Sequence, residues 1–262
     1  MKPDYKNWMP KGMLISILAG AAAALVLFVL AVVGVMSESP TARLVLSIVF
    51  GVLTLGMFFF SVLGISWYRA FDYNGKRQMS RQISEGVADH VKLPDGGRGL
   101  DVGCGSGALT IACAKRNPNA SMLGVDRWGK EYASFNKPLC ENNAKAEGVT
   151  NVSFQPGDAL HLDFPDGTFD AVTSNYVYHN IAGQNKQDLL LETLRVLKKG
   201  GTFAIHDIMS APRYGDMDVF VKRLKDMGYE KVELIDTSKV FMSPREAKWL
   251  GLAGSTLLVG IK

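Results

Sequence analysis

Three closely spaced glycines constrain this chain more than any other feature. Gly103, Gly105 and Gly107 stand between a short apolar run, Gly99–Val102, and a helical pattern that begins at once with Ala108–Ala112. This order predicts a strand, a tight turn and the start of a helix. Glycine is needed there because the backbone must turn sharply and because a Cβ atom would hold a ligand away from the peptide N–H groups. The helix would then direct the positive end of its dipole at whatever lies in the turn.

A carboxylate follows the turn at a spacing of about twenty residues. Ser121–Val125 is a second apolar run, and Asp126 ends it. A carboxylate at the tip of the second strand can accept hydrogen bonds from both hydroxyls of a ribose. The turn and the carboxylate together predict a nucleoside ligand.

The glycine turn fits two kinds of nucleoside site. Read loosely, Gly103, Gly105 and Ala108 fit the dinucleotide fingerprint, whose last position accepts alanine. Read tightly, Asp101-Val-Gly-Cys-Gly-Ser-Gly107 resembles motif I of the class I S-adenosylmethionine-dependent methyltransferases. We favour the methyltransferase over a nicotinamide enzyme, because residues 95–262 resemble that family segment by segment and in the right order.

Three later segments carry the rest of this resemblance. Gly157-Asp158-Ala159 is similar to the family's adenine-reading acidic turn after the third strand. Phe169–Asn175 is similar to its fourth strand, and Leu197–Gly201 to its turn before strand five. The resemblance implies an α/β, Rossmann-like methyltransferase fold. Its sheet would have seven strands and be mostly parallel, with an antiparallel last strand between strands five and six.

The resemblance also implies which residues hold the cofactor, S-adenosylmethionine. Asp101 would favour the methionine ammonium, directly or through water, and Asp126 would bind the ribose hydroxyls. Trp128 is either a flat partner for the adenine or a residue that packs the loop. Asp158 would accept from the adenine amino group, and the Ala159 N–H would donate to a ring nitrogen. The full implied set is Asp101, Gly103, Cys104, Gly105, Gly107, Asp126, Arg127, Trp128, Gly157, Asp158, Ala159, Asn175 and Tyr176.

The acceptor side is less defined. His179 follows the expected fourth strand, and Asn175–Asn180 resembles the stretch in which many small-molecule methyltransferases place a histidine. It is a candidate base or substrate contact, or else it holds a backbone carbonyl. His206 and Asp207 end the expected fifth strand and point to opposite faces, so they do not form a ready dyad. His179 and His206 are the candidate catalytic residues. The chain lacks an Asn-Pro-Pro-Tyr signature, which disfavours amino-group methylation of nucleobases or protein amides.

Two long uncharged runs precede this region. Met13–Met36 and Leu44–Ser66 each exceed twenty residues, so each helix would reach about 35 Å, enough to cross a hydrocarbon core of about 30 Å. The short connector predicts an antiparallel transmembrane hairpin. A cleaved signal peptide fits less well, because the first run is too long and a second follows. We expect an anchor at residues 1–70 and a methyltransferase domain at 71–262.

Charge predicts the orientation of the hairpin. Basic residues flank both outer ends, whereas the connector holds one Arg against one Glu; the flanking residues are Lys2, Lys6, Lys11, Arg69, Lys76, Arg77 and Arg81. The positive-inside rule therefore places both termini and the catalytic domain in the cytoplasm, at the inner cell membrane. Neither run contains an ionisable residue, so the hairpin is expected to anchor rather than to transport.

Composition excludes other classes of function. A net charge of only +4 gives no broad basic face for nucleic acid. Three cysteines without a C-x-x-C pair argue against a disulfide framework or a metal site, and favour buried thiols in a reducing compartment. Met79, Ile83, Val87 and Val91 recur at intervals of four, which predicts an amphipathic helix before the first strand.

The remaining elements alternate between strand and helix, which predicts a parallel sheet covered on both faces. Expected strands are Gly99–Val102, Ser121–Asp126, Val152–Pro156, Phe169–Asn175, Thr202–Ile208, Val232–Asp236 and Ser255–Ile261; expected helices are Ala108–Arg116, Pro138–Glu147 and Lys186–Leu197. Arg127–Lys137 is expected to be a loop beside the ribose or a kinked first turn. Gly148 and Gly200 stand where helix ends favour a left-handed residue.

The sequence therefore predicts a membrane-anchored S-adenosylmethionine-dependent methyltransferase for a small or lipid-like acceptor. Two alternatives remain at this point. One is a methyltransferase-like module that binds the cofactor, or nothing, and serves in interactions without catalysis. The other is an NAD(P)-binding oxidoreductase. The sequence names neither the acceptor nor the oligomeric state.

Overall fold

The computed structural model describes residues 2–129 and 134–262. Its contacts divide the described chain into two compact units, residues 7–78 and residues 2–6 with 79–262. The division differs from the expected boundary at residue 70 in two ways. Residues 72–78, which connect the second apolar helix to the rest of the chain, belong to the unit of the apolar helices. Residues 2–6 belong to the larger unit, and Asp4 hydrogen-bonds to one of its helices.

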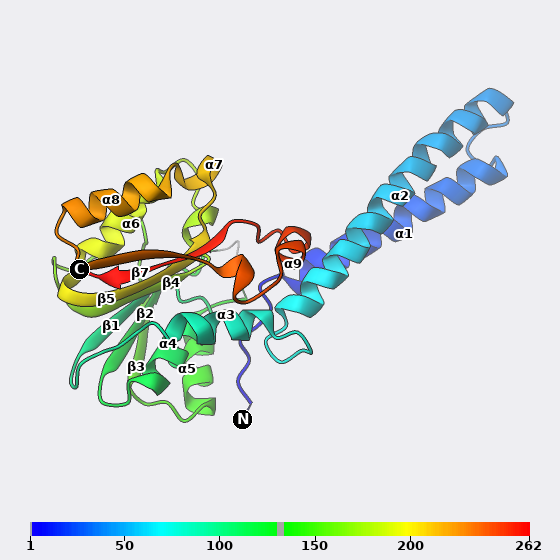
Figure 1. Ribbon diagram of the computed structural model, residues 1–262. Coiled ribbons are helices and arrows are strands. Elements are labelled where there is room, and N and C mark those ends of the chain that lie inside the picture. The colour runs from blue at the N-terminus through cyan, green and yellow to red at the C-terminus, as the bar shows by residue number, and fades with distance from the viewer. Residues whose placement is uncertain (1, 130–133) are drawn as a thin grey trace. The chain divides into compact units, whose positions relative to one another are not determined.

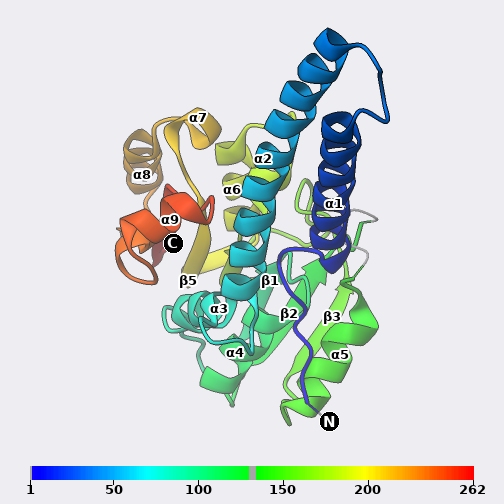
Figure 2. The same cartoon turned by 90° about the vertical axis from the view of Figure 1, so that its right-hand side faces the viewer.

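The smaller unit is a helical hairpin of α1 (Lys11–Val33) and α2 (Pro40–Phe71), which lie antiparallel, side by side (Figure 2). Gly34 adopts the left-handed conformation that ends α1, and Ser39 caps α2 ahead of Pro40. The connector therefore lies nearer the N-terminus than residues 37–43, which separate the two predicted apolar runs.

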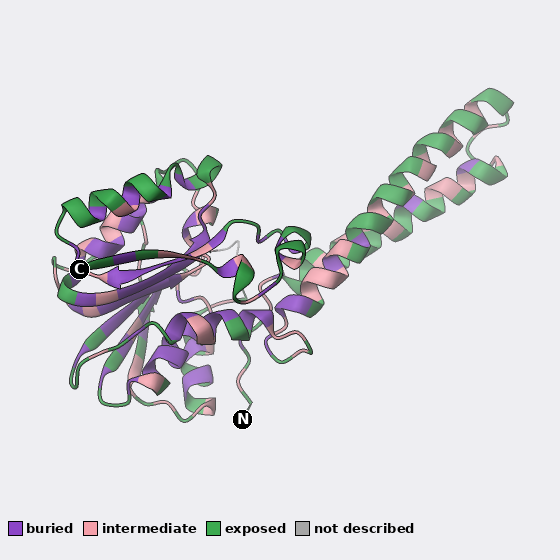
Figure 3. Ribbon diagram, viewed as in Figure 1, coloured by how far each residue is buried: buried purple, intermediate pink, exposed green. Residues whose placement is uncertain are grey.

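Both helices are long and apolar enough to cross a membrane. The most apolar 18-residue windows have mean hydropathies of 2.7 and 2.4, and only 11% of either window is buried. Across the two helices most residues are exposed (Figure 3), and many of them are large aliphatic or aromatic residues. By their length and composition, the two helices are thus candidate membrane spans.

The larger unit is built on a seven-stranded sheet with the order β3-β2-β1-β4-β5-β7-β6. The strand β7 runs antiparallel to both of its neighbours, and it lies between β5 and β6 as expected from the family resemblance. The strands are β1 (Arg98–Val102), β2 (Ser121–Asp126), β3 (Val152–Pro156), β4 (Phe169–Asn175), β5 (Leu197–Ile208), β6 (Lys231–Asp236) and β7 (Ser255–Ile261).

Helices cover both faces of this sheet. Figure 1 shows α4 and α5 on one face, and α6 and α8 on the other. The remaining bounds are α3 (Met79–Ala88), α4 (Ala108–Arg116), α5 (Lys137–Ala146), α6 (Lys186–Arg195), α7 (Ala211–Tyr214), α8 (Met217–Asp226), α9 (Pro244–Trp249) and the 3-10 turns η2 (Tyr178–Asn180) and η3 (Thr237–Lys239). The predicted Rossmann-like fold is confirmed.

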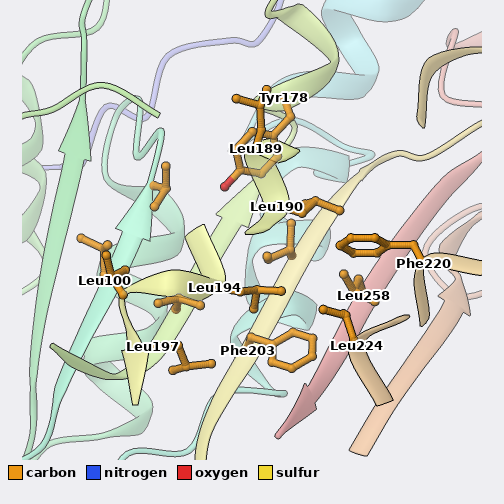
Figure 4. Packing of buried hydrophobic residues seen from close by; sticks show 14 of the residues in the cluster. Leu100, Tyr178, Leu189, Leu190, Leu194, Leu197, Phe203, Phe220, Leu224 and Leu258 are labelled. Atoms are coloured by element: carbon orange, nitrogen blue, oxygen red, sulfur yellow. The ribbon is translucent and has the colours of Figure 1, made fainter. Parts of the chain in front are cut away.

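The main core lies between the sheet and the helices of the α6–α8 face. Phe203 of β5 and Leu258 of β7 pack with Phe220 and Leu224 of α8 (Figure 4), and all four side chains are at most 1% exposed. On the opposite face, the amphipathic pattern before the first strand forms α3, in which Met79, Ile83 and Val87 are fully buried.

The two boundaries where α6 meets β5 were predicted wrongly. The helix expected over Lys186–Leu197 ends at Arg195, and β5 begins at Leu197 rather than at Thr202. A register shift between Phe169 and Ala171 accommodates this bulged start of β5. Gly200 has its positive φ of 77° inside the strand and does not cap the helix. Gly148, after α5, does have the expected left-handed conformation.

Candidate cofactor and acceptor site

The glycine turn and the strand-tip carboxylate meet at the carboxyl edge of the sheet. The Gly105 N–H donates to Asp126 Oδ2 at 2.8 Å, and the Trp128 N–H donates to Oδ1 at 2.7 Å. The register of β1 on β2 produces this meeting, because Val102 pairs with Val125. The turn lies where the strand order reverses between β1 and β4, the place at which open α/β sheets bind ligands.

Two of the turn's glycines are required by close packing. Gly103 has a φ of 73°, and a Cβ on it would lie 2.2 Å from Val177 Cγ2. Gly107 has a φ of 83° and is the N-cap of α4, where a Cβ would lie 3.1 Å from the Phe154 ring. Both positions combine a left-handed backbone with a filled neighbourhood, so L side chains fit poorly there.

Trp128 also contacts the turn. Its indole N–H donates to the Gly105 carbonyl at 3.0 Å, and its backbone has a positive φ of 45°. The side chain is therefore held against the glycine turn. Arg127 beside it is exposed. Arg127–Gly129 has no regular structure and α5 begins at Lys137, whereas residues 130–133 of the expected loop lie outside the described residues.

Asp101 is buried beneath the turn with an exposure of 1%. The Thr110 hydroxyl donates to its Oδ2 at 2.6 Å and the Thr173 hydroxyl to its Oδ1 at 2.9 Å. Burial raises the pKa of Asp101 to about 7, against the opposing effect of the two hydroxyls. Sequence reasoning did not identify these threonines.

The three cysteines are free and buried. Burial raises the pKa of the Cys104 thiol well above its usual value, and the hydrogen bond with Cys140 raises it further. A thiol of this kind is a weak nucleophile. The geometry agrees with the interpretation of these cysteines as buried packing residues.

The acidic turn after β3 is joined to the end of β2. The Gly157 N–H donates to the Asp126 carbonyl at 3.0 Å, and a Cβ on Gly157 would lie 2.9 Å from Val125 Cβ. Asp158 is exposed, and its Oδ1 accepts from the Leu160 N–H at 2.9 Å. The structure therefore brings the expected ribose and adenine residues to one edge.

Asn175 ends β4 beside a buried histidine. His206 Nδ1 lies 2.8 Å from Asn175 Oδ1, and His206 Nε2 lies 2.7 Å from the Thr237 hydroxyl. His206 is completely buried, and this burial lowers its pKa to about 3. Because both ring nitrogens are already hydrogen-bonded, His206 is placed to orient Asn175 rather than to exchange protons with an acceptor, a geometry that disfavours the predicted catalytic role.

His179 lies at the same edge, in η2. Its Nδ1 is 2.6 Å from Asp207 Oδ1, and its side chain is 18% exposed. Asp207 is fully buried; burial acts to raise the pKa of Asp207, but the hydrogen bond from His179 and its charge lower that pKa overall. Tyr176 has a φ of 55°, and its hydroxyl lies 2.7 Å from Ser255 Oγ, with its pKa raised by burial.

Sequence reasoning missed Asp207 as the partner of His179. Strand alternation correctly separated Asp207 from His206, which faces the other side of the sheet, but it could not show that η2 returns to Asp207. The pairing leaves His179 Nε2 as the ring atom not bound to Asp207. Across residues 2–129 and 134–262, no group of three or more His, Cys, Asp or Glu side chains could hold a metal ion.

Comparisons with known proteins point to a methyltransferase domain. Residues 100–205 match a family model described as a methyltransferase domain. The 27-O-demethylrifamycin SV methyltransferase of Amycolatopsis mediterranei is 25% identical over 170 residues, which cover 65% of this chain and 60% of that protein. The demethylmenaquinone methyltransferase of Thermus thermophilus is 35% identical over 114 residues, covering 44% of this chain and 48% of the relative.

This chain therefore spans roughly half of the length of the curated relatives it matches, 48% and 60% for these two. Among solved structures, the cyclase SpnF matches with a TM-score of 0.52 at 20% identity, over 73% of this chain and 85% of that one. At this identity the likeness concerns the fold alone.

Proposed function

This chain carries a class I S-adenosylmethionine-dependent methyltransferase domain, and we propose that it methylates a small or lipid-like acceptor at a membrane surface. The contact between Gly105 and Asp126 is the observation that carries the proposal. It joins the glycine turn to the strand-tip carboxylate at 2.8 Å, in the position where a nucleoside would be held.

The residues at this edge fit the cofactor. Each Asp126 oxygen accepts one backbone N–H and keeps a further lone-pair position, so the carboxylate can also accept two ribose hydroxyls. Asp126 is half-buried and so reachable. Asp158 would meet the adenine amino group, and Asp101 and Asn175 the methionine end. S-adenosylmethionine supplies a methyl group already activated by its sulfonium.

The protein's own tasks are then to align the acceptor, exclude water and remove a proton where the acceptor carries one. His179 suits the last task. The low pKa of Asp207 keeps that carboxylate ionised, so its oxygen favours a proton on His179 Nδ1 and leaves Nε2 as a proton acceptor. We propose His179 as the base and Asp207 as the residue that orients it.

The two candidate spans support a membrane location. A domain held at the bilayer by α1 and α2 meets acceptors that partition into lipid, such as a quinone, an isoprenoid or a phospholipid headgroup. Similarity to a demethylmenaquinone methyltransferase favours a quinone, and similarity to a 27-O-demethylrifamycin SV methyltransferase favours a small-molecule acceptor. The basic flanks of the hairpin favour a cytoplasmic catalytic domain.

Calorimetry on the full chain in detergent tests the cofactor. We expect S-adenosylhomocysteine to bind, Asp126→Ala to weaken it at least tenfold, and NAD(P) to give no heat. Tighter binding of NAD(P) would overturn the assignment. Label transfer from methyl-labelled S-adenosylmethionine into fractionated membrane and cytosolic extracts then tests the acceptor. Label in lipid fractions supports a lipid-like acceptor, and binding without any transfer would favour a non-catalytic module.

Cysteine labelling in intact cells tests the topology. The native cysteines are buried, so a membrane-impermeant maleimide would report on introduced ones. Ser37→Cys, in the connector, should be labelled from outside, whereas Lys199→Cys, exposed on the catalytic unit, should react only after permeabilisation. The opposite pattern would invert the proposed orientation, and release of the protein by alkaline carbonate would exclude spanning.

A further inference from the structure

One face of α5 is turned toward the cofactor turn. Cys140, Asn143 and Glu147 share this face, because residues three and four apart are neighbours on a helix. Cys140 Sγ donates to the Gly105 carbonyl at 3.2 Å, and Asn143 Nδ2 donates to the Ser106 carbonyl at 3.0 Å. The helix α5 therefore holds two successive carbonyls of the turn.

The same Asn143 amide also binds the chain that precedes the first apolar helix. The Asp4 N–H donates to Asn143 Oδ1 at 2.7 Å, and Asn143 Nδ2 donates to the Asp4 carbonyl at 3.0 Å. Beside them Tyr5 is only 3% exposed, and its hydroxyl donates to Glu147 Oε1 at 3.2 Å. Residues 2–6 thus lie along α5 as an ordered arm.

The hydrogen bonds of Asn143 connect the arm to the turn. A carboxamide has two N–H donors and one oxygen, and here the donors bind Asp4 and Ser106 while the oxygen binds Asp4. The side chain is 1% exposed. If the arm left, the buried oxygen of Asn143 and one of its N–H groups would lose their partners, which costs free energy. Turning the amide of Asn143 toward water would remove that cost. That rotation would release the Ser106 carbonyl.

We propose that residues 2–6 are a strap on the cofactor turn, and that Asn143 is the positioning residue through which the strap acts on the turn. The segment leading into the first candidate span would then help to set the turn's geometry, so that cofactor affinity depends on the arm being docked. This inference rests on the proposed cofactor function of the turn, although the structural coupling itself can be measured without cofactor.

Calorimetry with S-adenosylhomocysteine on the full-length protein in detergent tests the strap. Asn143→Ala removes the connection directly, and Tyr5→Ala undocks the arm without touching the turn. Each should bind about three- to tenfold more weakly, the loss expected for one or two hydrogen bonds. Asn142→Ala is the matched control, because Asn142 is the exposed neighbour on the same helix; it should bind like the wild type.

Hydrogen exchange provides a readout that a merely structural role would not reproduce. In Tyr5→Ala, the amides of residues 103–107 should exchange faster, while those of β7 should keep their wild-type rates. Tyr5→Phe retains the buried ring and should restore most of the protection. Unchanged exchange and affinity in both Tyr5→Ala and Asn143→Ala would overturn the proposal, as would an equal loss in Asn142→Ala.

The two possible failures are distinguishable. If the proposed function is wrong, the wild type itself binds no S-adenosylhomocysteine, whereas faster exchange of residues 103–107 in Tyr5→Ala still reports the strap. If only the strap is wrong, the wild type binds and Tyr5→Ala binds equally well.

Discussion

Nδ1 of His179 lies 2.6 Å from Oδ1 of Asp207, and the backbone N–H of the same histidine donates to Oδ2 at 3.1 Å. The carboxylate therefore fixes both the ring and the peptide of His179. Because Asp207 also accepts from the Ile208 N–H at 2.6 Å, it is itself held in place. This two-point attachment fixes a histidine of the 3-10 turn η2 at the edge of the site.

Replacing His179 by Gln should lower kcat by about a hundredfold or more, the lower range for loss of a general base. S-adenosylhomocysteine affinity should stay unchanged. Asp207→Asn should lower kcat by about ten- to a hundredfold, because the charge-assisted hydrogen bond to His179 is lost while the shape of the side chain is kept. His161→Gln is the control, since that side chain is 84% exposed. A His179→Gln enzyme with wild-type kcat would exclude base catalysis by this residue.

Cofactor affinity should depend on pH through Asp101. Its pKa of about 7 in the cofactor-free protein means that it is protonated in mildly acidic solution. A bound ammonium group favours the ionised carboxyl, so binding below pH 7 must release a proton. S-adenosylhomocysteine affinity should therefore fall by up to about tenfold for each pH unit below 7.

Calorimetry in buffers of different ionisation enthalpy checks this proton release. Asp101→Asn should bind more weakly at neutral pH and show little pH dependence between pH 5.5 and about 7. A wild-type affinity that is flat over the same range would show that Asp101 is not coupled to the cofactor.

Stability should respond to pH through Asp101 and His206 in opposite directions. The folded-state pKa of Asp101 is raised, so its contribution is fully present below about pH 3.9 and is lost as pH rises through about 7. The folded-state pKa of His206 is lowered to about 3, so the unfolded chain takes up the proton first. Its contribution is lost as pH falls below about 6.5. From about pH 4 to 6.5 the two slopes cancel.

The Asp101→Asn variant should expose the His206 slope. Relative to the wild type, its free energy of unfolding should fall by about 1.4 kcal/mol for each unit of pH from about 6.5 down to 4. Thermal unfolding in detergent at several pH values measures this. Adding Thr237→Val to Asp101→Asn tests the assignment to His206, because it removes the hydroxyl that hydrogen-bonds to this buried ring. Parallel pH profiles for wild type and Asp101→Asn would contradict the opposed titrations.

The sequence predicted that the glycine turn and Asp126 lie together at one edge of the sheet, because local rules determine this contact. The spacing from Gly105 to Asp126 measures one strand–helix–strand unit, and parallel pairing brings the two residues together wherever the rest of the chain goes. The antiparallel position of β7 is different, since periodicity could not show it and only the family resemblance implied it.

The residues missed by the sequence depend on tertiary placement. Asn143 lies in a helix among other polar residues, and nothing local distinguishes it from the exposed Asn142. Its role exists only because α5 docks with that face on the turn and because residues 2–6 return to it. Likewise, the partner of His179 follows from where η2 crosses the end of β5. Pairing that depends on packing between distant segments leaves no periodic signal.

Gly103→Ala should destabilise the protein through contact as well as through backbone strain. Gly103 and Gly96 share a φ of 73°, but nothing lies within 4 Å of a Cβ on Gly96, whereas one on Gly103 would lie 2.2 Å from Val177 Cγ2. Gly96→Ala therefore isolates the left-handed strain, about 1–2 kcal/mol. Gly103→Ala should cost about 1–3 kcal/mol more, the range for overpacking, and should weaken S-adenosylhomocysteine binding.

Val177→Ala in the Gly103→Ala background separates the two causes. It removes both Cγ atoms that meet the new methyl group, so most of the excess over Gly96→Ala should disappear in thermal unfolding, while the strain stays. Because Val177 leads directly into η2, restored packing should also restore cofactor affinity. Equal losses of unfolding free energy in Gly103→Ala and Gly96→Ala would mean that Val177 moves aside for the new methyl group. The cofactor and acceptor halves of the site would then not be rigidly joined at this contact.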